Sequence, residues 1–325
     1  TSKLIKKTEK LYVYSSIDSY FSLDRFIEKT KKIIDDLEMK DNLILWSYFP
    51  VFIEYLGKLG EKLVVFDAVD NWTEHPSFSK LKERLRNNYK VIDEKADLIF
   101  TVSKELVELF QNKEKIHWIP NGIDAAHFQK EAKIISRDIT NIKKPIIGYI
   151  GIIQDRVDTD ILEYIAKKNP DKSLVLIGQT WPIFLRKFRK PTAEIQRLEK
   201  FPNVYFLGPK SYDEAPSYLQ QFDLGIIPHK VDEFTRSMNP LKLYEYLACG
   251  LPVVTTSVSG AEVFENIIYT AHHKEEFNEK ISQALSEDSE ELRRKRKEII
   301  KIHSWDKRIE EMLNYIMPLV NKKSL

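Results

Sequence analysis

The sequence predicts an α/β protein of two domains, each built on a parallel β-sheet. Its 325 residues are 42% hydrophobic and 31% charged, which is ordinary for a globular chain with room for two cores. Short apolar, β-branched runs alternate with longer segments of helical periodicity. This alternation occurs twice, with a polar stretch at 125–144 between the two series. Strands separated by helices of this length favour right-handed crossovers and parallel pairing.

The first series predicts an N-terminal domain over residues 1–130. Its expected strands are 11–16, 43–48, 63–69, 98–103 and 116–120. A helix is expected over 21–40, because Phe26, Ile27, Ile33 and Ile34 recur at helical spacing, and a charged surface helix over 80–96. The chain begins at Thr1 without a methionine, so we expect a start that is processed or shortened.

The second series predicts a C-terminal domain over residues 145–300. Its expected strands are 145–153, 173–178, 204–208, 223–228 and 252–256. One or two helices are expected between 290 and 317, with an apolar face of Trp305, Ile309, Met312 and Ile316. Such a face needs a partner surface, and we expect residues 301–325 to pack back toward the N-terminal domain.

Composition excludes several classes of function. Lysine and arginine number 51 against 49 acids, so there is no global argument for binding nucleic acid, and RRKRK at 293–297 is interpreted as a solvated helix face. A single cysteine, Cys249, excludes an internal disulfide framework and a cysteine metal cluster, which fits a reducing compartment. No run approaches the roughly 20 apolar residues of a membrane span, and the first ten residues are too polar for a signal peptide. We therefore expect a cytoplasmic protein.

The stretch SMNPLKLYEYLACGLPVVTT, residues 237–256, carries the strongest functional signal. Asn239 is a favoured N-cap and Pro240 a favoured first helical residue, so a helix is expected to start there. The amides of the first turn and the ammonium of Lys242 together suit a phosphate group. Glu245, one turn further on, is able to accept hydrogen bonds from a ribose. The alternative is a surface ion pair between Lys242 and Glu245.

These residues resemble the family 4 glycosyltransferases of the GT-B fold, which use nucleotide sugars. The resemblance rests on NPLKLYEYLACGLPVVTT, IPNGIDAAHF and the strand pair PIIGYIGII and SLVLIG, and the C-terminal half is the more specific. It implies two Rossmann-like domains whose parallel sheets face a cleft. It further implies that the C-terminal domain binds the nucleotide sugar and that the last helix crosses back to the N-terminal domain.

The resemblance also implies roles for individual residues. Glu245 matches the second glutamate of the family's paired motif, which holds the ribose, whereas Ser237 stands where the family has the first glutamate, which contacts the sugar ring. Arg156 stands where the family places a basic residue on the diphosphate. The expected donor-binding residues are Ser237, Met238, Asn239, Leu241, Lys242, Glu245, Arg156, Asn121 and Gly122. Asn121 and Gly122 match the crossover motif between the domains, although a simple Asn-Gly turn is an even alternative.

Two aspartates after a buried strand of the N-terminal domain, Asp67 and Asp70, are catalytic candidates together with Arg156 and Lys242. Either carboxylate could orient an acceptor hydroxyl or cap the following helix. An aromatic platform for the acceptor at Trp46, Tyr48 and Phe49 is less favoured than core packing.

The motif Asp158-Thr159-Asp160 matches a metal-binding signature of other glycosyltransferases, but we favour helix capping. We expect neither a metal nor a cofactor beyond the donor substrate.

The resulting hypothesis is a glycosyltransferase that moves a sugar from a nucleotide diphosphate sugar to a carbohydrate or lipid-linked acceptor in surface glycan synthesis. A hexosyl transfer with retention follows only from the resemblance. The alternatives are a nucleotide-sugar epimerase and a noncatalytic nucleotide-binding or scaffolding subunit. Peripheral contact with the inner face of a membrane stays open, because Lys80, Lys82, Arg84, Arg86 and Lys90 form a basic helix, although a solvated surface is favoured.

Overall fold

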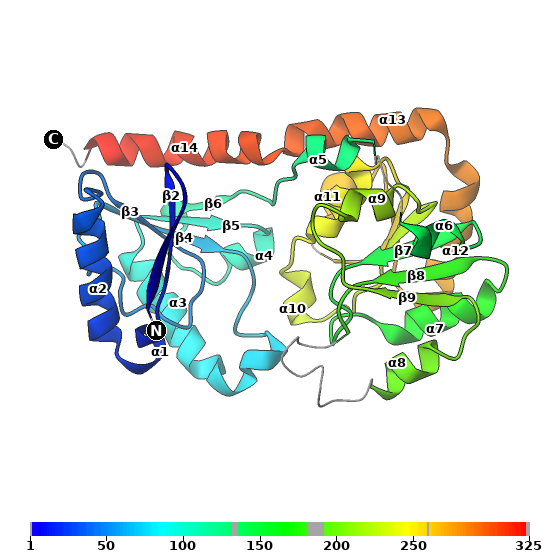
Figure 1. The fold of residues 1–325 in the computed structure, drawn as a ribbon, viewed down its shortest axis with the longest axis horizontal. Coiled ribbons are helices and arrows are strands. Elements are labelled where there is room, and N and C mark those ends of the chain that lie inside the picture. The colour runs from blue at the N-terminus through cyan, green and yellow to red at the C-terminus, as the bar shows by residue number, and fades with distance from the viewer. Residues whose placement is uncertain (1, 132–135, 181–191, 259, 323–325) are drawn as a thin grey trace. The chain divides into compact units, whose positions relative to one another are not determined.

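The protein forms two compact units in the computed structural model, which describes residues 2–131, 136–180, 192–258 and 260–322 (Figure 1). Unit 1 comprises Thr1–Trp118 with Met312–Leu325, and unit 2 comprises Ile119–Glu311. Both contain a parallel sheet, so the expected α/β class is confirmed. The functional domains expected at 1–130, 145–300 and 301–325 stay a prediction.

Unit 1 is built on a four-stranded parallel sheet in the order β3-β4-β5-β6. These strands are β3 (Ile44–Ser47), β4 (Leu63–Ala68), β5 (Leu98–Thr101) and β6 (Ile116–Trp118). The helices are α1 (Asp18–Phe21), α2 (Leu23–Asp36), α3 (Lys82–Lys95) and α4 (Lys104–Val107). Helix α3 is amphipathic: Leu85, Tyr89 and Ile92 are buried, and its other face carries charged residues. The expected helices at 21–40 and 80–96 are therefore confirmed as α2 and α3.

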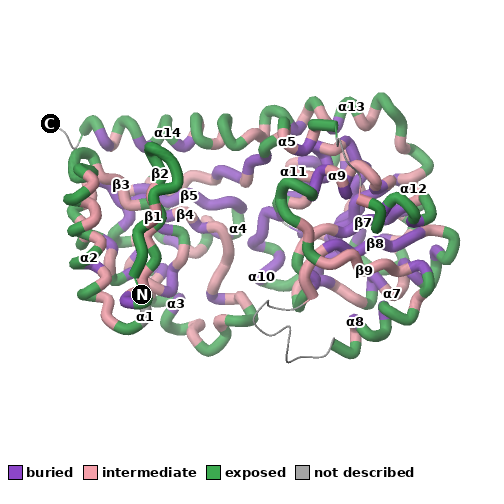
Figure 2. The backbone as a smooth tube through the Cα atoms, viewed as in Figure 1, coloured by how far each residue is buried: buried purple, intermediate pink, exposed green. Residues whose placement is uncertain are grey.

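The strand expected at 11–16 does not join this sheet. Strand β2 (Leu11–Ser15) pairs antiparallel with β1 (Lys3–Thr8), so the prediction that it belongs to the parallel sheet is wrong. The reason is local: two strands joined by a two-residue connection can pair only as an antiparallel hairpin. The hairpin is largely exposed, as Figure 2 shows.

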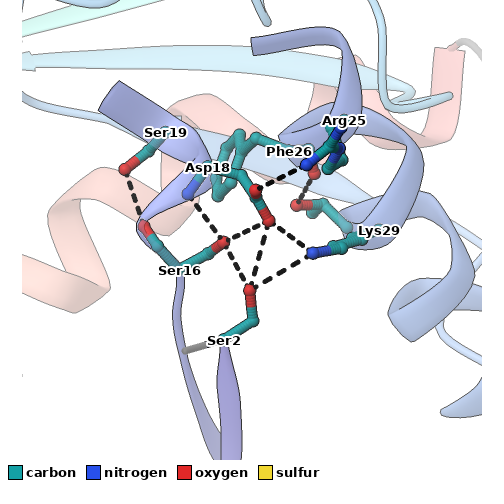
Figure 3. A network of polar contacts seen from close by, with 8 residues as sticks. Ser2, Ser16, Asp18, Ser19, Arg25, Phe26 and Lys29 are labelled. Atoms are coloured by element: carbon teal, nitrogen blue, oxygen red, sulfur yellow. Dashed lines mark hydrogen bonds and ion pairs between the residues drawn. The ribbon is translucent and has the colours of Figure 1, made fainter. Parts of the chain in front are cut away.

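A buried carboxylate ties this hairpin to α2 (Figure 3). Asp18 accepts hydrogen bonds from Lys29 Nζ at 2.5 Å, from Ser16 Oγ at 3.0 Å and from Ser2 Oγ at 3.2 Å. The hydrogen bond from Lys29 is the main reason why the pKa of Asp18 is lowered. Because its partners come from both strand ends and from α2, we assign this network a structural role.

Unit 2 contains a six-stranded parallel sheet in the order β12-β11-β10-β7-β8-β9. These strands are β7 (Ile146–Ile150), β8 (Ser173–Ile177), β9 (Val204–Gly208), β10 (Leu224–Ile227), β11 (Val253–Thr256) and β12 (Tyr269–Ala271). The strand order reverses between the neighbours β7 and β10. In doubly wound sheets this reversal is the switch point, and ligands bind there, outside the carboxyl ends of the strands.

Helices cover both faces of this sheet, and successive strand residues point into two separate cores. On one face Ile146, Val175 and Val253 pack beneath α11 (Leu241–Ala248). On the other face Ile147, Leu174 and Val254 pack beneath α7 (Thr159–Lys168) and α12 (Lys274–Glu287). The remaining helices are α5 (Ala125–Gln129), α6 (Arg137–Thr140), α8 (Ala193–Leu198), α9 (Ala215–Leu219), α10 (Glu233–Arg236) and α13 (Glu290–Ile299).

The C-terminal tail forms α13 and then α14 (Trp305–Lys322). Met312 and Ile316 are buried as expected, but Trp305 and Ile309 are 40% and 50% exposed, so the expected apolar face is wrong in its first half. The part of α14 from Met312 onward belongs to unit 1, where the Tyr315 ring stacks on His117 at 3.6 Å between centroids. Of these four side chains, the two in the part of α14 that belongs to unit 1 are therefore buried, and the two that precede it are exposed.

The run RRKRK on α13 is also not the uniformly solvated face that was expected. Arg296 is only 3% exposed, and its Nη1 donates to Asp288 Oδ1 at 2.6 Å and to the Gly250 carbonyl oxygen at 3.2 Å. Gly250 directly follows the C-cap residue of α11. This buried arginine therefore fixes the end of the helix whose beginning carries the candidate site.

Candidate active site

The candidate site lies at the switch point of the unit 2 sheet, where two loops leave the neighbouring strands β7 and β10. The loops are joined by backbone hydrogen bonds from Asp158 N to the Pro228 oxygen at 2.7 Å and from Lys230 N to the Arg156 oxygen at 2.8 Å. This short antiparallel pairing places Val157, the residue after Arg156, opposite His229. A basic side chain from the first loop and a histidine from the second are thus positioned by the backbone.

Two glycines allow the first loop to pass close to the end of the neighbouring strand β8. Gly151 N donates to the Ile177 oxygen at 2.9 Å, and a Cβ atom on Gly178, whose φ is +152°, would lie 1.8 Å from the Gly151 oxygen. Only glycine fits at position 178. A Cβ on Gly151 would lie 3.1 Å from Lys242 Cε, so the open face of this turn is occupied by the lysine side chain.

Lys242 comes from the first turn of α11. Its Nζ lies 5.3 Å from the centre of the Tyr149 ring, at the end of β7. Although the residue as a whole is of intermediate exposure, burial of the ammonium lowers its pKa from 10.5 to about 8. The Arg156 guanidinium lowers the pKa further, whereas Glu245 acts in the opposite direction. The folded protein therefore holds a cation in a place that disfavours positive charge.

Glu245 lies one turn further along α11, as the spacing predicted. Burial raises the pKa of its carboxyl, and Lys242 and His127 oppose that rise. Across the described residues, the side chains of Lys242, Glu245 and Arg156 form no hydrogen bond or ion pair with another protein group. The expected alternative, a surface ion pair between Lys242 and Glu245, is therefore wrong. Two cations and one carboxylate remain available to a ligand.

Asn239 does not cap this helix, and that prediction is wrong. Helix α11 begins at Leu241 with Pro240 in the cap position, and no side chain accepts a hydrogen bond there. Asn239 instead pairs with Asn121: Asn121 N donates to Asn239 Oδ1 at 3.0 Å, and Asn121 Nδ2 donates to the Asn239 backbone oxygen at 2.7 Å. The amides of Leu241 and Lys242 thus begin a helix that no side chain caps.

The other expected donor-binding positions are packed within unit 2. Ser237 Oγ donates to the Phe234 oxygen at 2.7 Å, and both Ser237 and Met238 are buried. A Cβ on Gly122 would lie 2.9 Å from the backbone N and Cα of Trp305. The close approach expected at this glycine is therefore real, but it is made to the start of α14.

The two catalytic aspartate candidates lie in unit 1. Asp67 Oδ2 accepts a hydrogen bond from Trp46 Nε1 at 3.3 Å, and burial raises the pKa of this carboxyl. The backbone oxygen of Asp70 accepts a hydrogen bond from the Tyr89 hydroxyl at 3.1 Å. Trp46 is 40% exposed and Tyr48 is 59% exposed, so the expectation that they pack in the core is wrong. Between ring centroids, Trp46 nevertheless stacks on Phe100 at 5.6 Å, and Phe49 packs against Trp72 at 4.8 Å.

The motif Asp158-Thr159-Asp160 caps a helix, as expected. Asp158 Oδ1 accepts hydrogen bonds from Asp160 N at 3.0 Å and from Ile161 N at 3.2 Å, at the start of α7. Among the residues that the structure describes, no group of three or more His, Cys, Asp or Glu side chains is placed to hold a metal ion.

Comparison with known proteins agrees with this geometry. Residues 144–287, which contain the switch point, Lys242 and Glu245, match the family described as glycosyl transferases group 1. The chain thus carries a group 1 glycosyltransferase domain, and its fold is that of the GT-B glycosyltransferases. The resemblance expected from the sequence is thereby confirmed.

The glycosyltransferase is similar to TuaH of Bacillus subtilis (strain 168), which is assigned to teichuronic acid biosynthesis. The two are 25% identical over 83% of this chain and 71% of TuaH. Among solved structures, it is similar to a sucrose-phosphate synthase from Thermosynechococcus elongatus, with a TM-score of 0.73, 16% identity, and coverage of 98% and 86% of the two chains. It is also similar to Anabaena HepE in complex with UDP-glucose, with a TM-score of 0.66, 15% identity, and coverage of 90% and 82%.

Sequence reasoning missed two residues of the glycosyltransferase's candidate site, Tyr149 and His229. Burial raises the pKa of the Tyr149 hydroxyl, and its ring faces the Lys242 ammonium. His229 is the second residue after β10, and it is buried. The signal that selected Asp67 and Asp70 was a polar residue at the end of a buried strand or just after it. The same signal in IIPHK would have found His229.

A search of the described helices found none that is long and apolar enough to cross a membrane.

Proposed function

We propose that this glycosyltransferase transfers a sugar, as a hexosyl group and with retention, from a nucleoside diphosphate sugar to a carbohydrate or lipid-linked acceptor of a cell-surface glycan. One observation carries the proposal. The Lys242 ammonium and the Arg156 guanidinium act on one another at the uncapped start of α11, and neither forms an ion pair with a carboxylate among the described residues. A diphosphate would supply the missing negative charge.

The chemistry follows from that charge distribution. As the bond from the sugar to the diphosphate breaks, negative charge develops on the leaving group. Lys242, Arg156 and the amides of Leu241 and Lys242 would stabilise this charge, a preorganised arrangement that is worth roughly 3 kcal/mol per donor in other enzymes. Glu245, a partly desolvated acceptor one turn away, would hold the ribose hydroxyls.

We assign the donor to unit 2 and the acceptor to the N-terminal domain, where Asp67 or Asp70 would orient the acceptor hydroxyl. TuaH supports a surface glycan as the product, and the UDP-glucose complex of HepE makes a uridine nucleotide the first probe. Contact with a membrane through α3 receives less support, because Lys82, Arg84 and Arg86 form ion pairs with Glu74, Glu54 and Glu83 at 2.6, 3.2 and 2.8 Å.

The test is calorimetric titration of the full chain with UDP, GDP, ADP and TDP, without divalent metal. We expect one nucleotide to bind, with affinity lost in Glu245→Ala and weakened in Lys242→Ala. Lys230→Ala is the matched control, because this exposed lysine lies next to His229 in the second loop. Release of that nucleotide from its sugar conjugate only in the presence of an acceptor would establish transfer. If no nucleotide binds at millimolar concentration, the proposal is wrong.

A further inference from the structure

His229 is buried without a hydrogen-bond partner. Its exposed fraction is 0%, and within the described part of the chain neither Nδ1 nor Nε2 has a partner. Leaving a buried polar atom unpaired destabilises a folded protein by roughly 1–3 kcal/mol, so such atoms are rare unless a ligand or water completes them. The burial of this imidazole without a hydrogen-bond partner therefore requires a functional explanation.

The backbone around His229 is held on both sides. Its carbonyl oxygen accepts a hydrogen bond from Thr256 Oγ1 at 2.7 Å, at the end of β11, and the flanking Lys230 N donates to the Arg156 oxygen. The imidazole lies 6.5 Å from the Tyr149 ring, between centroids and at an interplanar angle of 65°. The ring is thus fixed at the switch point rather than mobile at the surface.

The charged groups that act on the imidazole are cations. Burial is the main reason why the pKa of His229 lies well below its ordinary value, and two cations, Lys242 from α11 and Arg156 from the loop after β7, lower it further. Tyr149 from β7 is a neutral phenol whose pKa is raised by burial. Asp158, the N-cap residue of α7, is engaged in capping that helix, and Thr256 from β11 contributes a hydroxyl. The charges that act on the ring are therefore those of two cations, and Glu245 offsets the charge of Lys242 only in part.

We propose that His229 binds the diphosphate group of the nucleotide sugar, that its imidazole donates a hydrogen bond to a phosphate oxygen, and that the ring takes up a proton when this anion binds. The inference rests on the proposed function, since it assigns a further residue to the same donor site. It accounts for one of the two unpaired nitrogens, because the ligand supplies a partner that the protein does not. An anion between the ring and the two cations would also offset their repulsion of a protonated ring.

The opposite interpretation is that His229 only fills space in the core. The two interpretations make opposite predictions for His229→Phe, which keeps a planar ring and removes both nitrogens. If His229 binds the diphosphate, the variant has a higher melting temperature than wild type without nucleotide, and its dissociation constant for UDP rises by roughly tenfold. If His229 is only a core residue, the affinity for UDP does not change.

The experiment titrates wild type, His229→Phe and His229→Asn with UDP at pH 7 in two buffers of different ionisation enthalpy. If UDP does not bind wild type, the nucleotide that binds best among GDP, ADP and TDP replaces it. The difference in heat between the buffers gives the number of protons taken up on binding. We expect uptake in wild type and less uptake in both variants, with an intermediate affinity for His229→Asn, since asparagine keeps a donor but does not titrate. Equal affinity and equal proton uptake in wild type and His229→Phe would overturn the inference.

A second measurement avoids dependence on the fold of a variant. In wild-type protein, the nitrogen resonances of the His229 ring, assigned by their loss in His229→Asn, should report a neutral ring at pH 6.5 without UDP and a protonated ring with it. An unchanged ring in saturated protein contradicts the inference. If wild type binds none of the four nucleotides, both proposals are wrong. If Lys242→Met loses binding and His229→Phe binds as wild type, only the role of His229 is wrong.

Discussion

Replacing Lys242 by methionine should stabilise the nucleotide-free protein. Burial and Arg156 lower the pKa of this lysine from 10.5 to about 8. At about 1.36 kcal/mol per pH unit, this lowering means that the protonated side chain destabilises the folded state by about 3 kcal/mol at pH 7. Methionine has a similar length and no charge. We therefore expect Lys242→Met to raise the free energy of unfolding at pH 7 by up to about 3 kcal/mol.

The sign of the pH dependence follows from the direction of the pKa change. Because the folded protein releases this proton near pH 8 and the unfolded chain near pH 10.5, the unfolded state binds more protons between these values. Raising the pH through this window therefore stabilises wild type relative to the variant. The advantage of Lys242→Met should fall from about 3 kcal/mol at pH 7 to about 2 kcal/mol at pH 9.

The titration of Lys242 should also change the affinity for a nucleotide. Here a rise in pH should weaken the interaction, whereas it stabilises the fold. The affinity of wild type for UDP, or for the nucleotide that it binds best, should fall about tenfold between pH 7 and pH 9, since the ammonium loses its proton above about pH 8. Lys242→Arg is the matched control, because arginine stays charged and its affinity should stay constant.

The assays are urea unfolding for stability and calorimetry for binding. A Lys242→Met protein that is less stable than wild type at pH 7, or whose advantage does not shrink with pH, would refute the argument that this ammonium is buried without a partner.

Three further predictions concern the same unit. Glu245→Gln should weaken nucleotide binding by roughly tenfold in calorimetry, because an amide replaces an ionised acceptor; unchanged affinity would exclude a ribose-binding role. Gly122→Ala should lower the free energy of unfolding in urea by about 1–3 kcal/mol, since its Cβ would lie 2.9 Å from the Trp305 backbone, and an unchanged midpoint would contradict that contact. Burial and the Arg308 guanidinium lower the pKa of His303 from 6.5 to about 4, so its contribution to stability is present above pH 6.5 and is lost as the pH falls toward 4. His303→Gln should accordingly lose less melting temperature than wild type between pH 7 and pH 5; equal losses would show that His303 does not titrate as described.

Local patterns predicted the secondary structure well. The alternation of strands and helices, the α/β class and the position of α11 follow from the periodicity of side chains within about 20 residues. The spacing from Lys242 to Glu245 places both on neighbouring turns of one helix, which needs no tertiary information. The predictions failed where the local preference of a residue competed with a hydrogen bond to a residue far away in the sequence. Asn239 is a favoured cap by itself, but Asn121, 118 positions away, takes its side-chain oxygen instead.

The sequence by itself determined the fold class, the family resemblance and the residues most suited to a nucleoside diphosphate, because helical spacing and residue chemistry are local properties. Only the tertiary structure decided which groups share the switch point. Tyr149, Arg156, His229 and Lys242 come from β7, the loop after it, the loop after β10 and α11, and the strand order that makes β7 and β10 neighbours cannot be read from any one segment. The pKa values of these groups depend on the same juxtaposition, since burial and like charge arise only after distant segments pack together.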